Sequence, residues 1–203
     1  MIKPKNSEKK GKKAQGSRGA LSKITSAIAN LRSGDGLVRK EARETLTLIG
    51  KQAVRPLIPL LKDIEDDVRW GAAKALADIA DARAASELVS TLEDHNFGVR
   101  WLAAEGLINI GRDALGPLLK ALIKNPDSVW LREGAHHVLH DLAKTGMKDL
   151  LTPVWVALEG VYPEIGVHEP ALKALQELRG KDFPKVFMKS IPKRIYPADW
   201  PKE

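Results

Sequence analysis

The sequence predicts an all-α solenoid of antiparallel helix pairs, with about five repeats and about ten helices. Three observations predict this fold class. Segments of one pattern recur along the chain, amphipathic stretches with a helical period lie between them, and neither kind shows the alternation typical of strands. The low aromatic content of 5% and the abundance of Ala and Leu also favour helices.

The recurring segments, called repeat segments below, align without gaps. They are VRKEARETLTLIG from Val38, VRWGAAKALADIA from Val68, VRWLAAEGLINIG from Val99, LREGAHHVLHDLA from Leu131 and VHEPALKALQELR from Val167. Successive starts are 30, 31, 32 and 36 residues apart. Each segment begins with an aliphatic residue, has Ala at position +4, and has Leu or Ile at positions +8 and +11. These positions share one face of a helix, so each segment predicts a helix with one buried face.

The stretches between the repeat segments predict the second helix of each pair. They read AVRPLIPLLKDI, ASELVSTLED, ALGPLLKALIK and LLTPVWVALEG. Pro56, Pro117 and Pro153 lie early in these stretches, where a helix tolerates proline. Pro59 lies further inside its stretch and predicts a bend.

Composition divides the chain into a solenoid, residues 20–179, and two basic ends. Residues 1–19 contain seven basic residues and one acidic residue and almost nothing apolar, which predicts a disordered arm with order beginning near Ala20. Residues 180–203 contain six basic and three acidic residues with several Pro and aromatic residues, and they predict a C-terminal cap or tail. The solenoid itself has 20 basic and 22 acidic residues, so the net charge of +7 comes from the ends.

The composition also excludes some classes of protein. There is no Cys, which excludes disulfides and thiolate metal sites and predicts a cytoplasmic protein. No apolar run is long enough to span a membrane, and the Lys-rich start lacks the apolar core of a secretory signal.

The pattern VRxxAAxALxxIG, followed by a PLIxLL-type helix, resembles the HEAT-like repeats named after phycobilisome lyases. The resemblance covers about residues 20–179. It implies that the repeat segments line the concave face of a superhelix, and we expect the solvent-facing positions of this face to bind another protein or peptide. The repeat pattern is specific for the fold and carries little information about function.

Positions +2 and +6 of each repeat segment point away from its buried face and are the candidate binding positions. Large aromatic residues at such positions are typical of interfaces, although packing between repeats is the alternative. The predicted partner-binding residues are Trp70, Lys74, Trp101, Glu105, Glu133 and His137 at these positions, and Trp130, which lies just before the first residue of its segment. In the fifth segment the same positions are Glu169 and Lys173.

An Arg follows the first position of four segments, and acidic or Asn residues precede it. We interpret these as a structural ladder between repeats and as helix N-caps, rather than as a binding site. The ladder consists of Arg39, Arg69, Arg100, Arg132, Asp67 and Asp127, with Asp35, Asp66 and Asn96 as further caps.

We predict no catalytic residues, no metal and no cofactor. His136, His137 and His140 form a cluster at helical spacing, but the spacing suggests no further metal ligand. A protein-binding scaffold is therefore the first functional hypothesis. The alternatives are weak electrostatic contact with nucleic acid through residues 1–19 and a lyase-type or accessory enzyme of the same repeat family.

Overall fold

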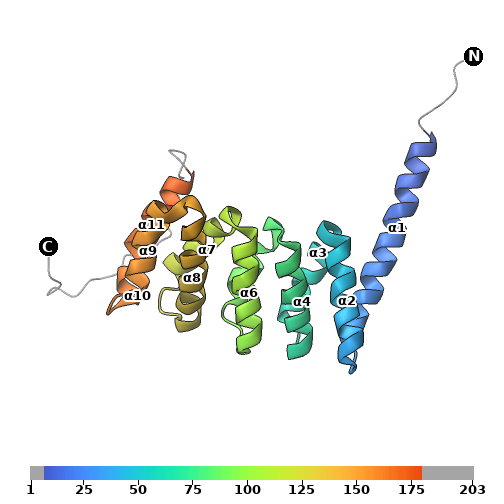
Figure 1. Cartoon of the computed structure of the whole chain (residues 1–203), viewed down its shortest axis with the longest axis horizontal. Helices are drawn as coiled ribbons and strands as arrows, with labels where there is room; N and C mark the ends of the chain where they lie inside the picture. Colours follow the sequence, from blue (N-terminus) through green and yellow to red (C-terminus); the bar gives the residue numbers. More distant parts are fainter. Residues whose placement is uncertain (1–6, 180–203) are drawn as a thin grey trace, which may run out of the picture.

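The computed structural model describes residues 7–179 as a row of stacked helices (Figure 1). The α-helices are α1 (Ser7–Asn30), α2 (Gly36–Ile49), α3 (Val54–Leu57), α4 (Asp66–Ile79), α5 (Ala85–Thr91), α6 (Phe97–Ile110), α7 (Arg112–Lys124), α8 (Val129–Leu142), α9 (Lys148–Leu158), α10 (Pro163–Gly166) and α11 (His168–Arg179). Shorter helical segments are η1 (Gly50–Gln52), η2 (Ile58–Lys62), η3 (Ala82–Ala84) and η4 (Ala143–Met147). Residues 7–179 contain no strand, and the predicted all-α solenoid is confirmed.

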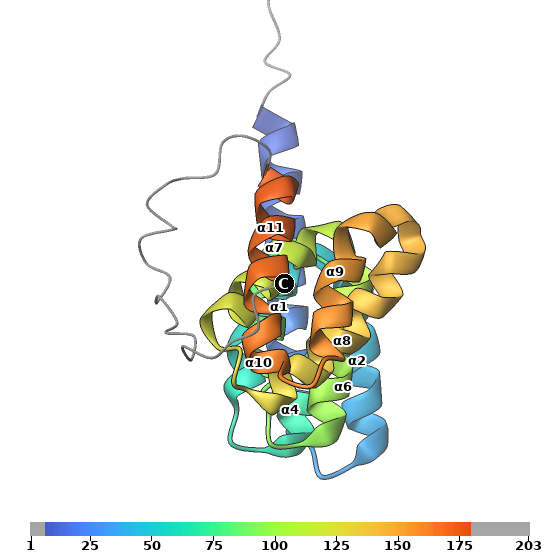
Figure 2. The same ribbon diagram turned by 90° about the vertical axis from the view of Figure 1, so that its left-hand side faces the viewer.

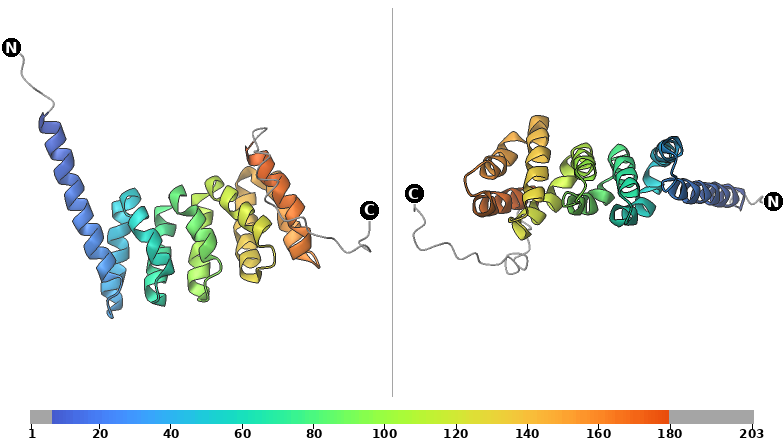
Figure 3. Two further views of the ribbon diagram at one scale, coloured as in Figure 1. Left: turned by 180° about the vertical axis from the view of Figure 1, so that it is seen from behind. Right: turned by 90° about the horizontal axis from the view of Figure 1, so that it is seen from below.

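The helices form two layers. Helices α2, α4, α6 and α8 are the first four repeat segments and pack side by side in the front layer. Helices α1, α5 and α7, together with α3 and η2, form the back layer (Figures 2 and 3). Pro59 lies in the first turn of η2, where the predicted helix changes from α to 3-10 geometry. The solvent-facing side of α2, α4, α6 and α8 is called the wall below.

The core lies between the two layers and consists mainly of Ala and Leu. The +4 and +8 positions of the front helices are at most 3% exposed: Ala42, Leu46, Ala72, Leu76, Ala103, Leu107, Ala135 and Leu139. Small residues let α4 and α6 approach closely, since a Cβ on Gly106 would lie 3.2 Å from the Cα of Ala77. The repeat period therefore predicts which residues are buried.

The first helix begins at Ser7, whereas the sequence predicted order from about Ala20. Six of the residues before Ala20 are Lys, whose straight side chains favour a helix even without an apolar face. The buried part of α1 is the predicted one, because Ile24, Ala27 and Leu31 pack in the core and α1 contacts α2. The arm over residues 1–19 stays a prediction.

The last two long helices exchange layers. Helix α9 packs beside α8 at the end of the front layer, and α11 packs against α7 and α9 at the end of the back layer (Figure 2). The prediction that the fifth repeat segment continues the wall through Glu169 and Lys173 is therefore wrong. Helices α8 and α9 are joined through η4, where the chain leaves helical geometry at Thr145 and at Gly146, whose φ is 90°. The following connection is long enough for α11 to cross to the other layer, in agreement with the 36-residue spacing.

The predicted cap or tail, residues 180–203, lies outside the described residues. Within residues 7–179, no helix combines the length and the apolar character that crossing a membrane requires.

Candidate partner-binding surface

A pocket of about 140 Å³ opens on the wall between α6 and α8. We call it the indole pocket, and its lining residues are Phe97, Arg100, Trp101, Ala104, Trp130, Glu133, Gly134 and His137. Four of the predicted partner-binding residues are in this set: Trp101, Trp130, Glu133 and His137. They meet because position +2 of α6 lies opposite position +6 of α8 when the two helices pack side by side.

Trp101 of α6 forms one side of the pocket, and His137 of α8 lies against it. The ring centroids of Trp101 and His137 are 4.8 Å apart and the rings are stacked, 26° from parallel. The Nε2 atom of His137 lies 3.2 Å from Oε1 of Glu105, which holds the imidazole in this orientation. Trp101 remains 47% exposed, so its ring is supported from one side and open to a partner.

Trp130 forms the α8 side of the pocket and is 42% exposed. The guanidinium carbon of Arg100 lies 4.7 Å from the Trp130 ring centroid and 5.6 Å from that of Phe97. Arg100 Nη1 donates to the carbonyl oxygens of Asp94 (2.8 Å) and His95 (3.2 Å), which fixes the guanidinium. Arg100, predicted only for the structural ladder, is therefore also part of the pocket.

Small residues contribute to the depth of the pocket. Ala104 is 3% exposed and Gly134 is partly buried. A Cβ on Gly134 would lie 2.7 Å from Cδ2 of Leu92, a fully buried side chain, so this position accepts no side chain without movement of the core. Sequence analysis did not identify Gly134 or Phe97. Phe97 is the first residue of α6 and is 68% exposed. Its position directly after the cap residue Asn96 is the sequence feature that could have identified it as exposed.

Trp70 and Lys74 lie outside the indole pocket. Trp70 is half-buried, packs against the core, and carries the guanidinium of Arg43 at 4.8 Å from its ring centroid. Its Cδ1 and Nε1 atoms would lie 3.3 Å from a Cβ on Gly98, so Trp70 packs against the next repeat. Lys74 Nζ pairs with Asp78 Oδ1 at 2.6 Å. Trp70 therefore packs between repeats, which was the alternative to its exposure at an interface.

The four Arg residues of the predicted ladder share one contact. In each, Nη1 donates to the backbone carbonyl six residues earlier: Arg39 to Ser33, Arg69 to Asp63, Arg100 to Asp94 and Arg132 to Pro126. The contact ties the loop before each front helix to the first turn of that helix, and it places the guanidinium at the boundary between repeats.

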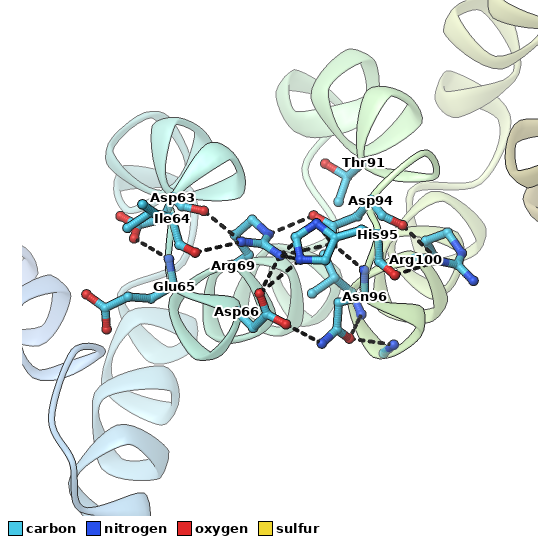
Figure 4. Close-up of polar contacts among 12 residues, drawn as sticks. Asp63, Ile64, Glu65, Asp66, Arg69, Thr91, Asp94, His95, Asn96 and Arg100 are labelled. Atoms are coloured by element: carbon cyan, nitrogen blue, oxygen red, sulfur yellow. Dashed lines mark hydrogen bonds and ion pairs between the residues drawn. The ribbon is translucent and has the colours of Figure 1, made fainter.

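Arg69 has the most extensive of these networks (Figure 4). Its Nε donates to Asp94 Oδ2 and its Nη2 to Asp66 Oδ1, both at 2.7 Å. Asp66 also accepts from the Asn96 amide at 2.8 Å. Hydrogen bonds from Asn96 and then from Arg69 hold the pKa of Asp66 below its ordinary value, and the bond to Asp94 raises the pKa of Arg69.

The other predicted ladder residues and caps are placed as follows. Arg39 Nη2 lies 3.2 Å from Asp67 Oδ2 across the α2–α4 boundary. Asp35 and Asn96 accept backbone N–H groups at the starts of α2 and α6. Helix α8 is capped by Ser128 instead of Asp127, and α4 begins after Glu65, with Asp66 and Asp67 in its first turn.

A second aromatic cluster lies beside the indole pocket, between α8 and α9. The Trp155 indole Nε1 donates to His136 Nε2 at 2.7 Å, and the His140 ring lies edge-on to Trp155 at 5.0 Å. Glu159 Oε1 lies 3.0 Å from the same nitrogen of His136. Sequence analysis missed Trp155 because it placed α9 in the back layer. Within residues 7–179, no three His, Asp or Glu side chains gather as metal ligands.

Comparisons with known proteins identify a repeat family and several solved structures that this chain resembles. The family model described as HEAT repeats matches residues 24–108 and 54–140. No curated protein matches the sequence. Two crystal structures of engineered proteins are similar to this chain. One has 23% identity and a TM-score of 0.39, covering 77% of this chain and 79% of its own. The other has 24% identity and a TM-score of 0.39, covering 77% of this chain and 48% of its own. A designed armadillo repeat protein in complex with a (KR)4 peptide has 20% identity and a TM-score of 0.38, covering 81% and 95%.

Proposed function

The chain belongs to the family of HEAT repeats, and on that premise we propose that it is a protein-binding scaffold whose partner docks at the indole pocket. The single observation that carries the proposal is the gathering of Phe97, Trp101 and Trp130 around one pocket while each remains 42–68% exposed. Each such side chain can bury a large apolar area, and aromatic residues are enriched among the side chains that dominate binding energy.

The surroundings of the pocket support docking of a protein segment. Trp101 is held by His137, and Trp130 by Arg100, so the rings lose little conformational freedom when a partner covers them. The pocket volume of about 140 Å³ suits one side chain of a partner. Charges of both signs line it, which favours a mixed protein surface over the phosphate backbone of a nucleic acid. We place this scaffold in the cytoplasm, in keeping with the absence of Cys.

Peptide display against the immobilised full-length chain tests the proposal. A selected peptide should bind the Trp101→Ala/Trp130→Ala variant at least roughly thirtyfold more weakly than the wild type, as loss of anchor residues implies. Leu48→Ala is the matched control, because Leu48 is 88% exposed on the wall outside the pocket. Circular dichroism should show the same helix content in all three proteins. Equal affinities for the wild type and the double variant reject the indole pocket as the site.

A second function rests on the basic composition of residues 1–19. We propose this segment as a weak electrostatic contact for nucleic acid. Affinity for a random duplex should fall steeply with salt and be lost when residues 1–19 are deleted. A truncated protein that binds the duplex equally well contradicts this function.

The narrower relationship, to the HEAT-like repeats of phycobilisome lyases, belongs to the same set of proposals. It rests on the VRxxAAxALxxIG pattern and implies a lyase-type or accessory role toward a prosthetic group. Titration of the protein with a bilin, followed by absorption spectroscopy, tests that role. An unchanged spectrum counts against it.

A further inference from the structure

Glu133 is an acidic side chain at the rim of the indole pocket. It is exposed, and within residues 7–179 it makes no hydrogen bond or ion pair. The other acidic side chains of α6 and α8 have partners, because Glu105 contacts His137 (3.2 Å) and Asp141 accepts from Lys144 (2.6 Å). The wall therefore presents a carboxylate whose charge is not balanced locally, next to two exposed indoles.

The cation inside the pocket does not balance this charge. Arg100 is held by the carbonyl oxygens of Asp94 and His95 and lies on the rings of Trp130 and Phe97. Among the described residues it forms no ion pair with Glu133. Swinging toward Glu133 would break two charge-assisted hydrogen bonds. The carboxylate is thus left for a group from outside.

The aromatic walls of the pocket suit a cation. An aromatic ring attracts a guanidinium or ammonium group to its face. Two indoles of the same wall already make this contact, with Arg43 at 4.8 Å from the Trp70 centroid and Arg100 at 4.7 Å from the Trp130 centroid. Trp101 has an imidazole stacked on it instead.

The chemistry of the occupant follows from what each type of side chain would do to Glu133. A neutral apolar side chain would remove water from the carboxylate without replacing its hydrogen bonds, which is unfavourable. An acidic side chain would be repelled by Glu133. A Lys or Arg side chain would bury its methylene groups between the rings and place its charge beside the carboxylate.

We infer that the indole pocket receives a Lys or Arg side chain of the partner, with Glu133 as its counter-ion and Trp101 and Trp130 along its aliphatic part. This inference rests on the proposed function and specifies the partner as a segment with a basic anchor residue. Recognition then combines an aromatic contact with a charge pair, so its strength depends on salt.

The experiment follows the indole N–H signals of the full-length chain in two-dimensional NMR. The probes are N-acetylarginine amide, N-acetyllysine amide and N-acetylleucine amide at millimolar concentrations. The two basic probes should shift the Trp101 and Trp130 signals in a saturable manner, with at least roughly fivefold higher affinity than the leucine probe. Glu133→Gln should weaken the basic probes roughly tenfold and leave the leucine probe unchanged. Glu44→Gln is the matched control, because Glu44 is an exposed acid on the wall that already pairs with Lys40.

The outcomes separate this inference from the proposed function. If the leucine probe binds as tightly as the basic probes, or Glu133→Gln changes nothing, the basic anchor is wrong while the pocket remains a docking site. If selected peptides bind the Trp101→Ala/Trp130→Ala variant normally, the docking site itself is wrong. A basic residue in the selected peptides, whose replacement by norleucine weakens binding to the wild type and not to Glu133→Gln, supports the inference.

Discussion

The guanidinium of Arg69 and the carboxylate of Asp94 form a nearly buried pair across the boundary between two repeats. Arg69 is 5% exposed and the Asp94 side chain 8% exposed, with Nε 2.7 Å from Oδ2 and Nη2 3.2 Å from Oδ1. The pair joins the start of α4 to the loop before α6, and it is the most sheltered ion pair among the described residues. It should therefore govern how firmly adjacent repeats are coupled.

Asp94→Ala should lower the free energy of unfolding by about 3 kcal/mol, because it leaves the Arg69 charge in a sheltered site with only part of its partners. Urea unfolding followed by circular dichroism measures the change. Asp67→Ala is the control, since Asp67 pairs with Arg39 but is 68% exposed, and it should cost less than about 1 kcal/mol. Equal losses for the two variants would show that burial does not determine the contribution of the ladder.

Gly134→Ala should destabilise the protein by about 1–3 kcal/mol, because the new methyl group would overlap Leu92 in a filled core. Gly19→Ala is the matched control in α1, where a Cβ meets nothing within 4 Å. There the better helix propensity of Ala should raise stability by about 0.5–1 kcal/mol. Thermal unfolding of both variants decides the matter, and a stabilised Gly134→Ala protein would contradict the close approach of α8 to Leu92.

Acid should destabilise the solenoid between about pH 4 and pH 2. Hydrogen bonds from the Arg83 side chain and from the Arg83 backbone N–H lower the pKa of Asp81 to about 2, and the Arg32 side chain lowers the pKa of Asp63. A carboxyl whose pKa is lower in the folded state stabilises that state above its unfolded pKa. This contribution is lost as the pH falls through the folded pKa.

Urea unfolding at several pH values between 2 and 5 measures the effect. Asp81→Asn should flatten the decline in unfolding free energy below about pH 4, because it removes the shifted titration. Arg83→Met should flatten the decline less, because the backbone N–H of residue 83 still donates to Asp81. A wild-type slope that persists in both of them would assign the acid sensitivity to other carboxyl groups.

The environment of Trp155 should depend on His136. His136 Nε2 faces an indole N–H that can only donate and a Glu159 carboxylate that, when ionised, can only accept. Replacing His136 by Leu removes the acceptor of the Trp155 indole N–H and leaves that group to water or to another partner.

The difference in fluorescence between the wild type and Trp155→Phe isolates the Trp155 emission. The same difference, measured in the His136→Leu background, should give a Trp155 emission of different intensity. His95→Leu is the control, since His95 contacts Asp66 at the α4–α6 boundary, away from Trp155. An identical Trp155 emission with and without His136 would contradict the contact between the two side chains.

The fold followed from the sequence because one periodic pattern determines both the helices and their buried faces. Every repeat segment has Ala at position +4 and Leu at position +8, as Ala72 and Leu76 illustrate, and each repeat contacts mainly its neighbours. The exchange of α9 and α11 did not follow, because the pattern describes each helix by itself. Which layer a helix enters depends on the length and geometry of its connections, here the turn at Gly146.

The candidate site followed only in part. Repeat position predicted that Trp101, Glu133 and His137 face the wall, but it could not separate Trp101 from Trp70, which occupies the same position one repeat earlier. Trp70 is covered by Arg43 of α2, and the position of α4 equivalent to Arg43 is Ala73, which is too short to cover Trp101. Exposure therefore depends on the neighbouring repeat, which the pattern of one segment does not contain.

The crossing of α9 and α11 determines where this array can gain or lose modules. A unit copied within α2–α7 brings both of its helices into their proper layers and can be inserted without altering its neighbours. A unit added after α8 in the ordinary order would find the front position already taken by α9, running antiparallel to the other front helices. Evolutionary or engineered lengthening should therefore be tolerated upstream of α8, and the surface around Trp101 and Trp130 should stay at a fixed distance from α11.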